Sequence, residues 1–303
     1  MLSMPESKED LIKGVGHAQA GHDVVMSSLA AREAALEKGY VEYLRLVGND
    51  TFVDVARKTD AACNDQPWRT LSRLAERHGA PRILQLWTKG PRAALARGGE
   101  LLARLRRRGA AILCQLTVTG YGPTIEPLVP WPVDWEGIDR LIEFLGTPEA
   151  VLWRFDPVIP GVADLGTLRT LAAGFASRGV VRAVYNWIEV GWEVVRRRLG
   201  PLERQLDTSL DRNVFSRLIE AVGQDCGVAF SILAEGDGLA GDLTLSTRGA
   251  WQYEWLLRVG PGFPSRGFLP AAFRPGCMCA PSFDVGLEGQ FDGCHRCLYC
   301  FAP

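Results

Sequence analysis

Short apolar runs alternate with longer segments of helical periodicity from residue 51 onward. The runs contain at most nine residues and are rich in β-branched and aromatic side chains, which predicts strands. The predicted strands are Thr51–Arg57, Arg82–Thr88, Ala111–Thr119, Ala150–Phe155, Val180–Tyr185 and Gly227–Ala234. The intervening segments place apolar residues at helical spacing and several end at a glycine, which predicts helices. These are Trp68–His78, Arg92–Arg108, Asp134–Leu145, Ala163–Ser177 and a helix that includes Val214–Val222.

This alternation of strand and helix predicts an α/β fold with a parallel sheet and right-handed crossovers. The 253 residues from position 51 onward are close to the usual length of a (β/α) barrel. We therefore expect a TIM-like barrel, closed or partly open, rather than a doubly wound sheet. The expected organisation is a helical extension over residues 1–50, the barrel over 51–270, and a cysteine-rich loop over 271–303 that closes over the barrel mouth.

The charge balance excludes some classes of partner. The chain has 34 Lys and Arg against 35 Asp and Glu, without the basic excess of a dedicated nucleic-acid-binding protein. No apolar run approaches the roughly 18 residues that a membrane span needs. The first residues do not resemble a signal peptide, so we expect a cytoplasmic protein without a membrane partner.

Cysteine is the one residue type with an unusual distribution. Five of the eight cysteines lie in a 24-residue window, where even spacing would place fewer than one. These five are Cys277, Cys279, Cys294, Cys297 and Cys300. A cytoplasmic chain with clustered cysteines is more typical of a metal or iron–sulfur site than of a disulfide framework.

Spacing alone leaves two kinds of site open. Two residues separate Cys294 from Cys297, and two more separate Cys297 from Cys300. This spacing suits three corners of a 4Fe–4S cluster and leaves one iron free for a small molecule. Zinc is the alternative, because Cys277 and Cys279 with two of the later cysteines would form a four-sulfur tetrahedron.

Polar residues occur where each predicted strand ends, which is where chemistry gathers in a parallel barrel. Burying charges costs several kcal/mol unless they are paired or bind a ligand. The set therefore predicts either a polar pocket for a small molecule or ion pairs at a solvated rim. The candidates for catalysis, or for binding a substrate or cofactor carboxylate, are Arg57, Asp60, Lys89, Arg154, Asp156 and Glu189. The candidates for cofactor binding at strand ends are Thr117, Thr119 and Asn186.

Several blocks of the sequence also carry a family resemblance. They are Arg57-Lys-Thr-Asp60, Trp87-Thr-Lys89, Leu116 to Gly122, Glu126-Pro127, Trp153 to Pro157 and the terminal cysteines. In this order they resemble the domain-of-unknown-function family numbered eighteen-forty-eight, over roughly residues 51–303. The terminal cysteines are also similar to the cluster motif of radical S-adenosylmethionine enzymes.

The resemblance implies that Cys294, Cys297 and Cys300 hold the cluster and that Tyr299 lies near a bound adenine. It implies reductive cleavage of S-adenosylmethionine, fed by a cellular electron donor, to a 5′-deoxyadenosyl radical that acts on an unidentified substrate. The sequence departs from the usual C-x3-C-x2-C motif, since Cys294 and Cys297 have only two residues between them. The alternative is a non-enzymatic binding protein stabilised by zinc or by a cluster.

Overall fold

The computed structural model describes residues 29–49, 51–57, 59–188, 193–200, 202, 206, 209–232, 282–286 and 294–300. Its centre is one parallel sheet with the strand order β6-β5-β4-β3-β2-β1-β7. The strands are β1 (Phe52–Val55), β2 (Ile83–Thr88), β3 (Ala111–Thr117), β4 (Val151–Val158), β5 (Arg182–Trp187), β6 (Ala229–Ile232) and β7 (Phe283–Asp284). Within the described residues no pairing joins β6 to β7, so the sheet forms an α/β fold whose closure into a barrel is not shown.

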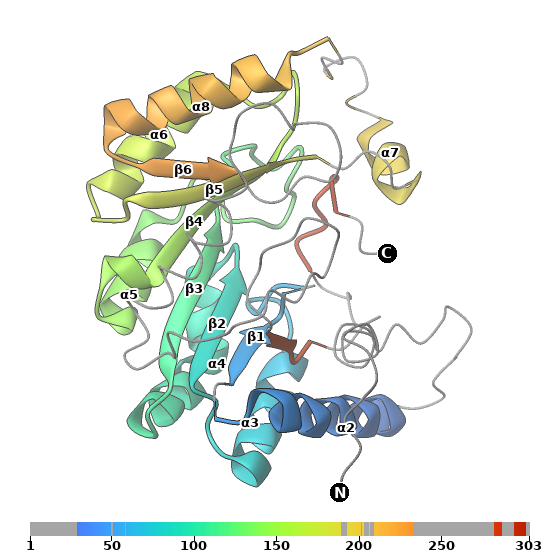
Figure 1. The fold of residues 1–303 in the computed structure, drawn as a ribbon. Helices are drawn as coiled ribbons and strands as arrows, with labels where there is room; N and C mark the ends of the chain where they lie inside the picture. The colour runs from blue at the N-terminus through green and yellow to red at the C-terminus, as the bar shows by residue number, and fades with distance from the viewer. Residues whose placement is uncertain are drawn as a thin grey trace, which may run out of the picture.

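Helices follow most of the strands. They are α2 (Leu29–Val47), α3 (Gln66–His78), α4 (Pro91–Arg107), α5 (Trp135–Leu145), α6 (Leu165–Ala176), α7 (Glu193–Leu199) and α8 (Arg212–Cys226), with a short 3-10 turn at Pro148–Ala150. Figure 1 shows α5, α6 and α8 along one side of the curved sheet, and α7 with the C-terminal segment on the other. None of the described helices has an 18-residue stretch apolar enough to cross a membrane.

The predicted strands and helices from residue 51 to 232 are present, and the main differences lie at their ends. Strand β4 runs past the predicted end at Phe155 to Val158, because a register shift against β5 accommodates Asp156 and Pro157. Strand β5 begins two residues later than predicted, at Arg182. The two-residue strand β7 and the short helix α7 were not predicted, because both are too short to show a periodic pattern.

Alternation along the strands separates an apolar face from a polar one. The Trp153 ring stacks on Phe175 of α6 at 4.5 Å, so this side chain faces the helices. Its neighbours Arg154 and Asp156 point to the opposite face, as the period of two along a strand requires. The polar face of the sheet is therefore the inner, concave one.

Helix α2 is tied to the edge of this sheet. Tyr40 and Tyr43 are both 2% exposed and lie 5.1 and 5.7 Å from the Phe283 ring of β7. The Tyr43 hydroxyl donates to the Phe52 carbonyl at 2.9 Å and accepts from the Phe52 amide at 2.8 Å. Residues 29–47 therefore share the main hydrophobic core with strands β1 and β7.

Candidate functional site

The C-terminal segment 294–300 lies at the carboxyl ends of the strands. The Leu128 amide donates to the His295 carbonyl at 3.3 Å, and the Leu298 amide donates to the Ile125 carbonyl at 3.0 Å. Both partners lie on the loop that follows β3. Leu298 and Tyr299 also pack against a small apolar cluster that includes residues 159 and 188, at the ends of β4 and β5. The segment thus covers the end of the sheet where a parallel fold places its chemistry.

Asp60 lies on the loop after β1 and accepts hydrogen bonds from several parts of this region. It is 3% exposed, and its Oδ1 accepts from the Ala62 amide and the Thr88 hydroxyl, both at 2.7 Å. Its Oδ2 accepts from the Lys89 amide at 2.5 Å and faces His295 Nε2 at 2.8 Å. Burial opposes the charge, but His295 and these donors outweigh it and hold the pKa of Asp60 below its usual value. Asp60 is therefore an ionised, buried carboxylate.

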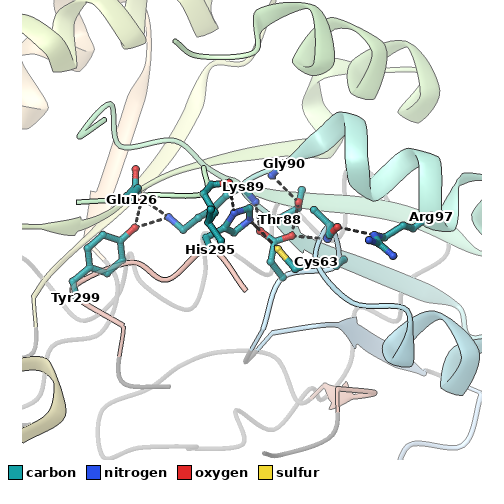
Figure 2. Close-up of polar contacts among 12 residues, drawn as sticks. Cys63, Thr88, Lys89, Gly90, Arg97, Glu126, His295 and Tyr299 are labelled. Carbon is teal, nitrogen blue, oxygen red and sulfur yellow. Dashed lines mark hydrogen bonds and ion pairs between the residues drawn. The ribbon is translucent and has the colours of Figure 1, made fainter. Parts of the chain in front are cut away.

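The His295 ring is held between the β3 loop and Asp60. Its Nδ1 lies 3.0 Å from the Leu128 carbonyl, which can only accept, so this nitrogen carries a proton. Its Nε2 faces Asp60 Oδ2 and also Cys63 Sγ, at 3.5 Å. Burial disfavours the imidazolium, but Asp60 outweighs burial and raises the pKa of His295. Figure 2 shows the ring between Lys89 and Cys63.

A second buried network joins Lys89 to Glu126 and Tyr299. Lys89 Nζ lies 2.8 Å from Glu126 Oε1 and donates to the Tyr299 hydroxyl at 2.6 Å. The Tyr299 hydroxyl in turn donates to Glu126 Oε1, and the Thr119 hydroxyl donates to Oε2 at 2.5 Å. Burial opposes both charges, yet their mutual attraction raises the pKa of Lys89 and lowers the pKa of Glu126. Burial and Glu126 raise the pKa of Tyr299 well above its usual value, so the phenol stays protonated.

The three described tail cysteines form no disulfide and lie in different surroundings. Cys297 is buried, and burial raises its pKa to about 12. Cys294 is half-buried and in hydrogen-bonding contact with the Cys63 thiol, which with the nearby imidazolium of His295 lowers its pKa to about 6. Cys300 is half-buried, and its carbonyl accepts from Arg198 of α7 at 2.9 Å. Cys294 is therefore more readily ionised than Cys297.

Only one group of described His, Cys, Asp and Glu side chains is gathered closely enough for a single ion. It consists of Asp60, Cys63 and His295, whose ligand atoms all lie within 4.8 Å of one another. Cys294, Cys297 and Cys300 are not gathered to that degree.

A separate polar cluster lies on the concave face of the sheet, around Trp87. The Arg154 guanidinium lies 4.7 Å from the Trp87 ring centroid, donates to Gln115 at 2.6 Å and pairs with Asp156. Arg57 lies 5.8 Å from the same centroid and 3.7 Å from Asp54. These guanidiniums are thus oriented by aromatic stacking and by acidic partners.

The structure divides the residues predicted from the sequence between these two regions. Asp60, Lys89, Thr119 and Tyr299 gather with the tail, whereas Arg57, Arg154 and Asp156 lie on the sheet face. Thr117 of β3 lies opposite Arg154 of β4 in the register of the sheet. Asn186 lies in β5, and its buried Oδ1 has no hydrogen-bond partner among the described residues. Glu189, Cys277 and Cys279 lie outside the described residues.

Three important residues were not among the predicted site residues: Cys63, Glu126 and His295. The sequence held weak signals for two of them, since Cys63 follows Asp60 by three positions and His295 adjoins a predicted ligand.

A cavity of about 20 Å³ lies beside Glu126 and is lined by Lys89, Thr119 and Trp131. A volume of that size holds about one water, so this cavity is too small for an organic substrate.

A family model described as Domain of unknown function (DUF1848) matches residues 58–302. The match begins just after β1, so it covers strands β2 to β7 and the C-terminal segment, and it leaves out α2, β1 and Arg57. No curated protein matches the chain.

Proposed function

Because the chain belongs to the DUF1848 family, whose description assigns no function, we propose its function from its own geometry. We propose an iron–sulfur enzyme that holds a 4Fe–4S cluster on Cys294, Cys297 and Cys300 and resembles radical S-adenosylmethionine enzymes. The observation that carries the proposal is the position of these three cysteines at the carboxyl ends of parallel strands, the active end of such folds.

The strand order supports a (β/α) barrel as the scaffold. The strands follow one another in chain order from β1 to β6, without the reversal that defines a doubly wound sheet. The last strand, β7, lies on the free edge of β1, which is the neighbour that the final strand has in a closed barrel. The balanced charge and the free cysteines fit a cytoplasmic protein.

The donor set fits a cluster in its chemistry. Three free thiols come from one seven-residue segment, and the nearby Lys89 ammonium offsets the negative charge that thiolates bring at Cys297. With S-adenosylmethionine bound, a reduced cluster supplies the electron that releases a 5′-deoxyadenosyl radical. A cellular electron donor would be its partner.

The remaining residues would position a small molecule. The protonated Tyr299 hydroxyl is fixed by Lys89 and Glu126, so its ring presents a rigid aromatic face beside the cysteines. On the sheet face, Arg154 is oriented over Trp87 and can bind a carboxylate of the substrate or of S-adenosylmethionine. The buried Oδ1 of Asn186 has no hydrogen-bond donor among the described residues, so it can accept a hydrogen bond from a ligand.

Anaerobic reconstitution with iron and sulfide tests this proposal. We expect about four irons per chain, a broad absorbance in the visible range, and 5′-deoxyadenosine after reduction in the presence of S-adenosylmethionine. Cys297→Ser and Cys300→Ser should each lose iron and product, whereas Cys226→Ser, on α8, should keep both. A protein that takes up no iron, or that never forms 5′-deoxyadenosine, contradicts the proposal.

One observation favours the alternative of a non-enzymatic binding protein. The buried pair of Asp60 and His295 fixes the tail to the loop after β1, as a structural clasp would. Under this alternative, a reconstituted protein would bind metal but form no 5′-deoxyadenosine with any cell extract.

A further inference from the structure

His295 Nε2 faces two groups that a single proton cannot satisfy. Asp60 Oδ2 lies 2.8 Å from this nitrogen and Cys63 Sγ lies 3.5 Å from it. A proton on Nε2 forms one strong hydrogen bond along one direction. A metal ion placed among the three atoms would contact all of them at once.

The surroundings of these three side chains resemble the outer shell of a metal site. A histidine that ligates a metal usually donates its other ring N–H to a carbonyl or carboxylate, which fixes the ring and its tautomer. His295 does so through Nδ1 and the Leu128 carbonyl. The Asp60 carboxylate is fixed in the same manner, since its Oδ1 is bound by the Thr88 hydroxyl and the Ala62 amide.

The loop that carries Cys63 is also fixed. The Ala62 carbonyl accepts from Arg97 Nε of α4 at 2.8 Å, and the Cys63 amide donates to the Asp60 carbonyl at 3.0 Å. Figure 2 shows Arg97 beside this loop and Cys63 next to the His295 ring. The thiol is thus presented to the histidine by a loop with backbone restraints, rather than by chance proximity on a surface.

The distance between Cys63 and His295 matches a tetrahedral ion. With bonds of about 2.3 Å to sulfur and 2.0–2.1 Å to nitrogen, a tetrahedral zinc places these two ligand atoms about 3.5 Å apart. The Cys63 to His295 distance already has this value. The same geometry puts a nitrogen and an oxygen ligand about 3.3 Å apart, so Asp60 and His295 would separate by about 0.5 Å when the ion replaces the proton between them.

We propose that Asp60, Cys63 and His295 form a mononuclear site for zinc, separate from Cys297 and Cys300. Thiolate, imidazole and carboxylate together favour zinc over the all-oxygen sites of calcium and magnesium. Cys294 contacts the Cys63 thiol but lies outside the close group. The site therefore has three protein ligands and one position open to water or a small anionic ligand.

Cobalt binding to the full-length, chelator-treated and iron-free protein tests this site under anaerobic, reducing conditions. We expect one equivalent of Co²⁺, displaced by one equivalent of Zn²⁺, with a thiolate-to-cobalt charge-transfer band and intense tetrahedral d–d bands. Cys63→Ser should remove the charge-transfer band and weaken binding at least about ten-fold. Cys226→Ser, a half-buried thiol on α8, is the matched control and should change neither.

The double variant Cys297→Ser/Cys300→Ser separates this site from the proposed cluster. It should retain the cobalt spectrum while it loses the ability to be reconstituted with iron, and Cys63→Ser should show the reverse. His295→Gln should weaken cobalt binding as Cys63→Ser does, with circular dichroism used to verify the fold of each variant. The proposal is overturned if Cys63→Ser keeps the charge-transfer band, or if the double variant loses it.

Discussion

Lys89 Nζ donates a 2.6 Å hydrogen bond to the hydroxyl of Tyr299, a residue 210 positions later in the chain. The contact joins the end of β2 to the cysteine segment. Both side chains also meet Glu126, so a buried ion pair and a phenol together fix the tail on the strand ends. The orientation of Cys297 and Cys300, on either side of Tyr299, depends on this network.

The first prediction concerns the cation of that network. Lys89→Met should destabilise the protein by about 3–5 kcal/mol, because it leaves the buried charge of Glu126 without its cation. Chemical denaturation measures the loss. Adding Glu126→Gln should recover part of it. Arg77→Met is the matched control, since solvent screens the exposed pair of Arg77 with Glu37 and its loss should destabilise the protein far less. Equal losses for Lys89→Met and Arg77→Met would contradict this reasoning.

The second prediction concerns the aromatic stack on the sheet face. In the iron-loaded protein, Arg154→Lys should weaken S-adenosylmethionine binding about ten-fold, because lysine cannot stack on Trp87 or form a bidentate contact with a carboxylate. Calorimetric titration measures this affinity. The control is Arg178→Lys, which changes a similar stack at 4.5 Å on Trp135 in the helical layer. Unchanged affinity in Arg154→Lys, with iron content preserved, would remove Arg154 from the ligand site.

The third prediction concerns helix α2, which lies outside the family match. Tyr43→Phe should cost about 1–3 kcal/mol, because it leaves the buried backbone groups of Phe52 without the hydroxyl that they share. Tyr40→Phe is the matched control on the same helix and should cost less. Thermal and urea unfolding measure both variants. If Tyr43→Phe is no more damaging than Tyr40→Phe, the hydroxyl does not stabilise the sheet edge.

The fourth prediction is a pH dependence set by Asp284. Burial, and then the neighbouring carboxylate of Asp54, raise the pKa of Asp284 to about 6. The unfolded chain has the lower pKa, so the native state binds the proton more tightly and Asp284 is destabilising once ionised. Its unfavourable contribution should therefore grow as the pH rises from about 4 to about 6, and then level off.

Asp284→Asn tests this dependence, because asparagine keeps a carbonyl oxygen for the Gly286 amide, which donates to Asp284 at 2.9 Å. The free energy of unfolding of the variant, relative to the wild-type chain, should improve between pH 4 and pH 7. A difference that stays constant over this range would show that folding does not raise the pKa of Asp284.

The sequence predicted the six longer strands because each lies in a short run rich in apolar residues. It did not predict β7, because Phe283 and Asp284 become a strand only through pairing with Val53 and Asp54. Tertiary contact, rather than local propensity, decides that element.

The candidate site was predictable in one respect only. Parallel strands bring their carboxyl ends together, and this rule alone predicts that Asp60 and Lys89 lie in one region. The contact of Cys63 with His295 joins residues 232 positions apart and depends on how the tail docks. Sequence spacing carries no information about that docking.

The pairing of β1 with β7 has a consequence for how the chain folds. The outer neighbour of β1, the first strand described, comes from residues more than 220 positions later in the chain. The Asp54 carboxylate likewise accepts a hydrogen bond from Ser282. Long sequence separation between contacting residues slows folding, because the intervening loop must be closed before the contact forms. During synthesis the exposed edge of β1 could instead pair with another nascent chain. We therefore expect folding of this protein to be slow, and its yield to depend on concentration and on chaperones.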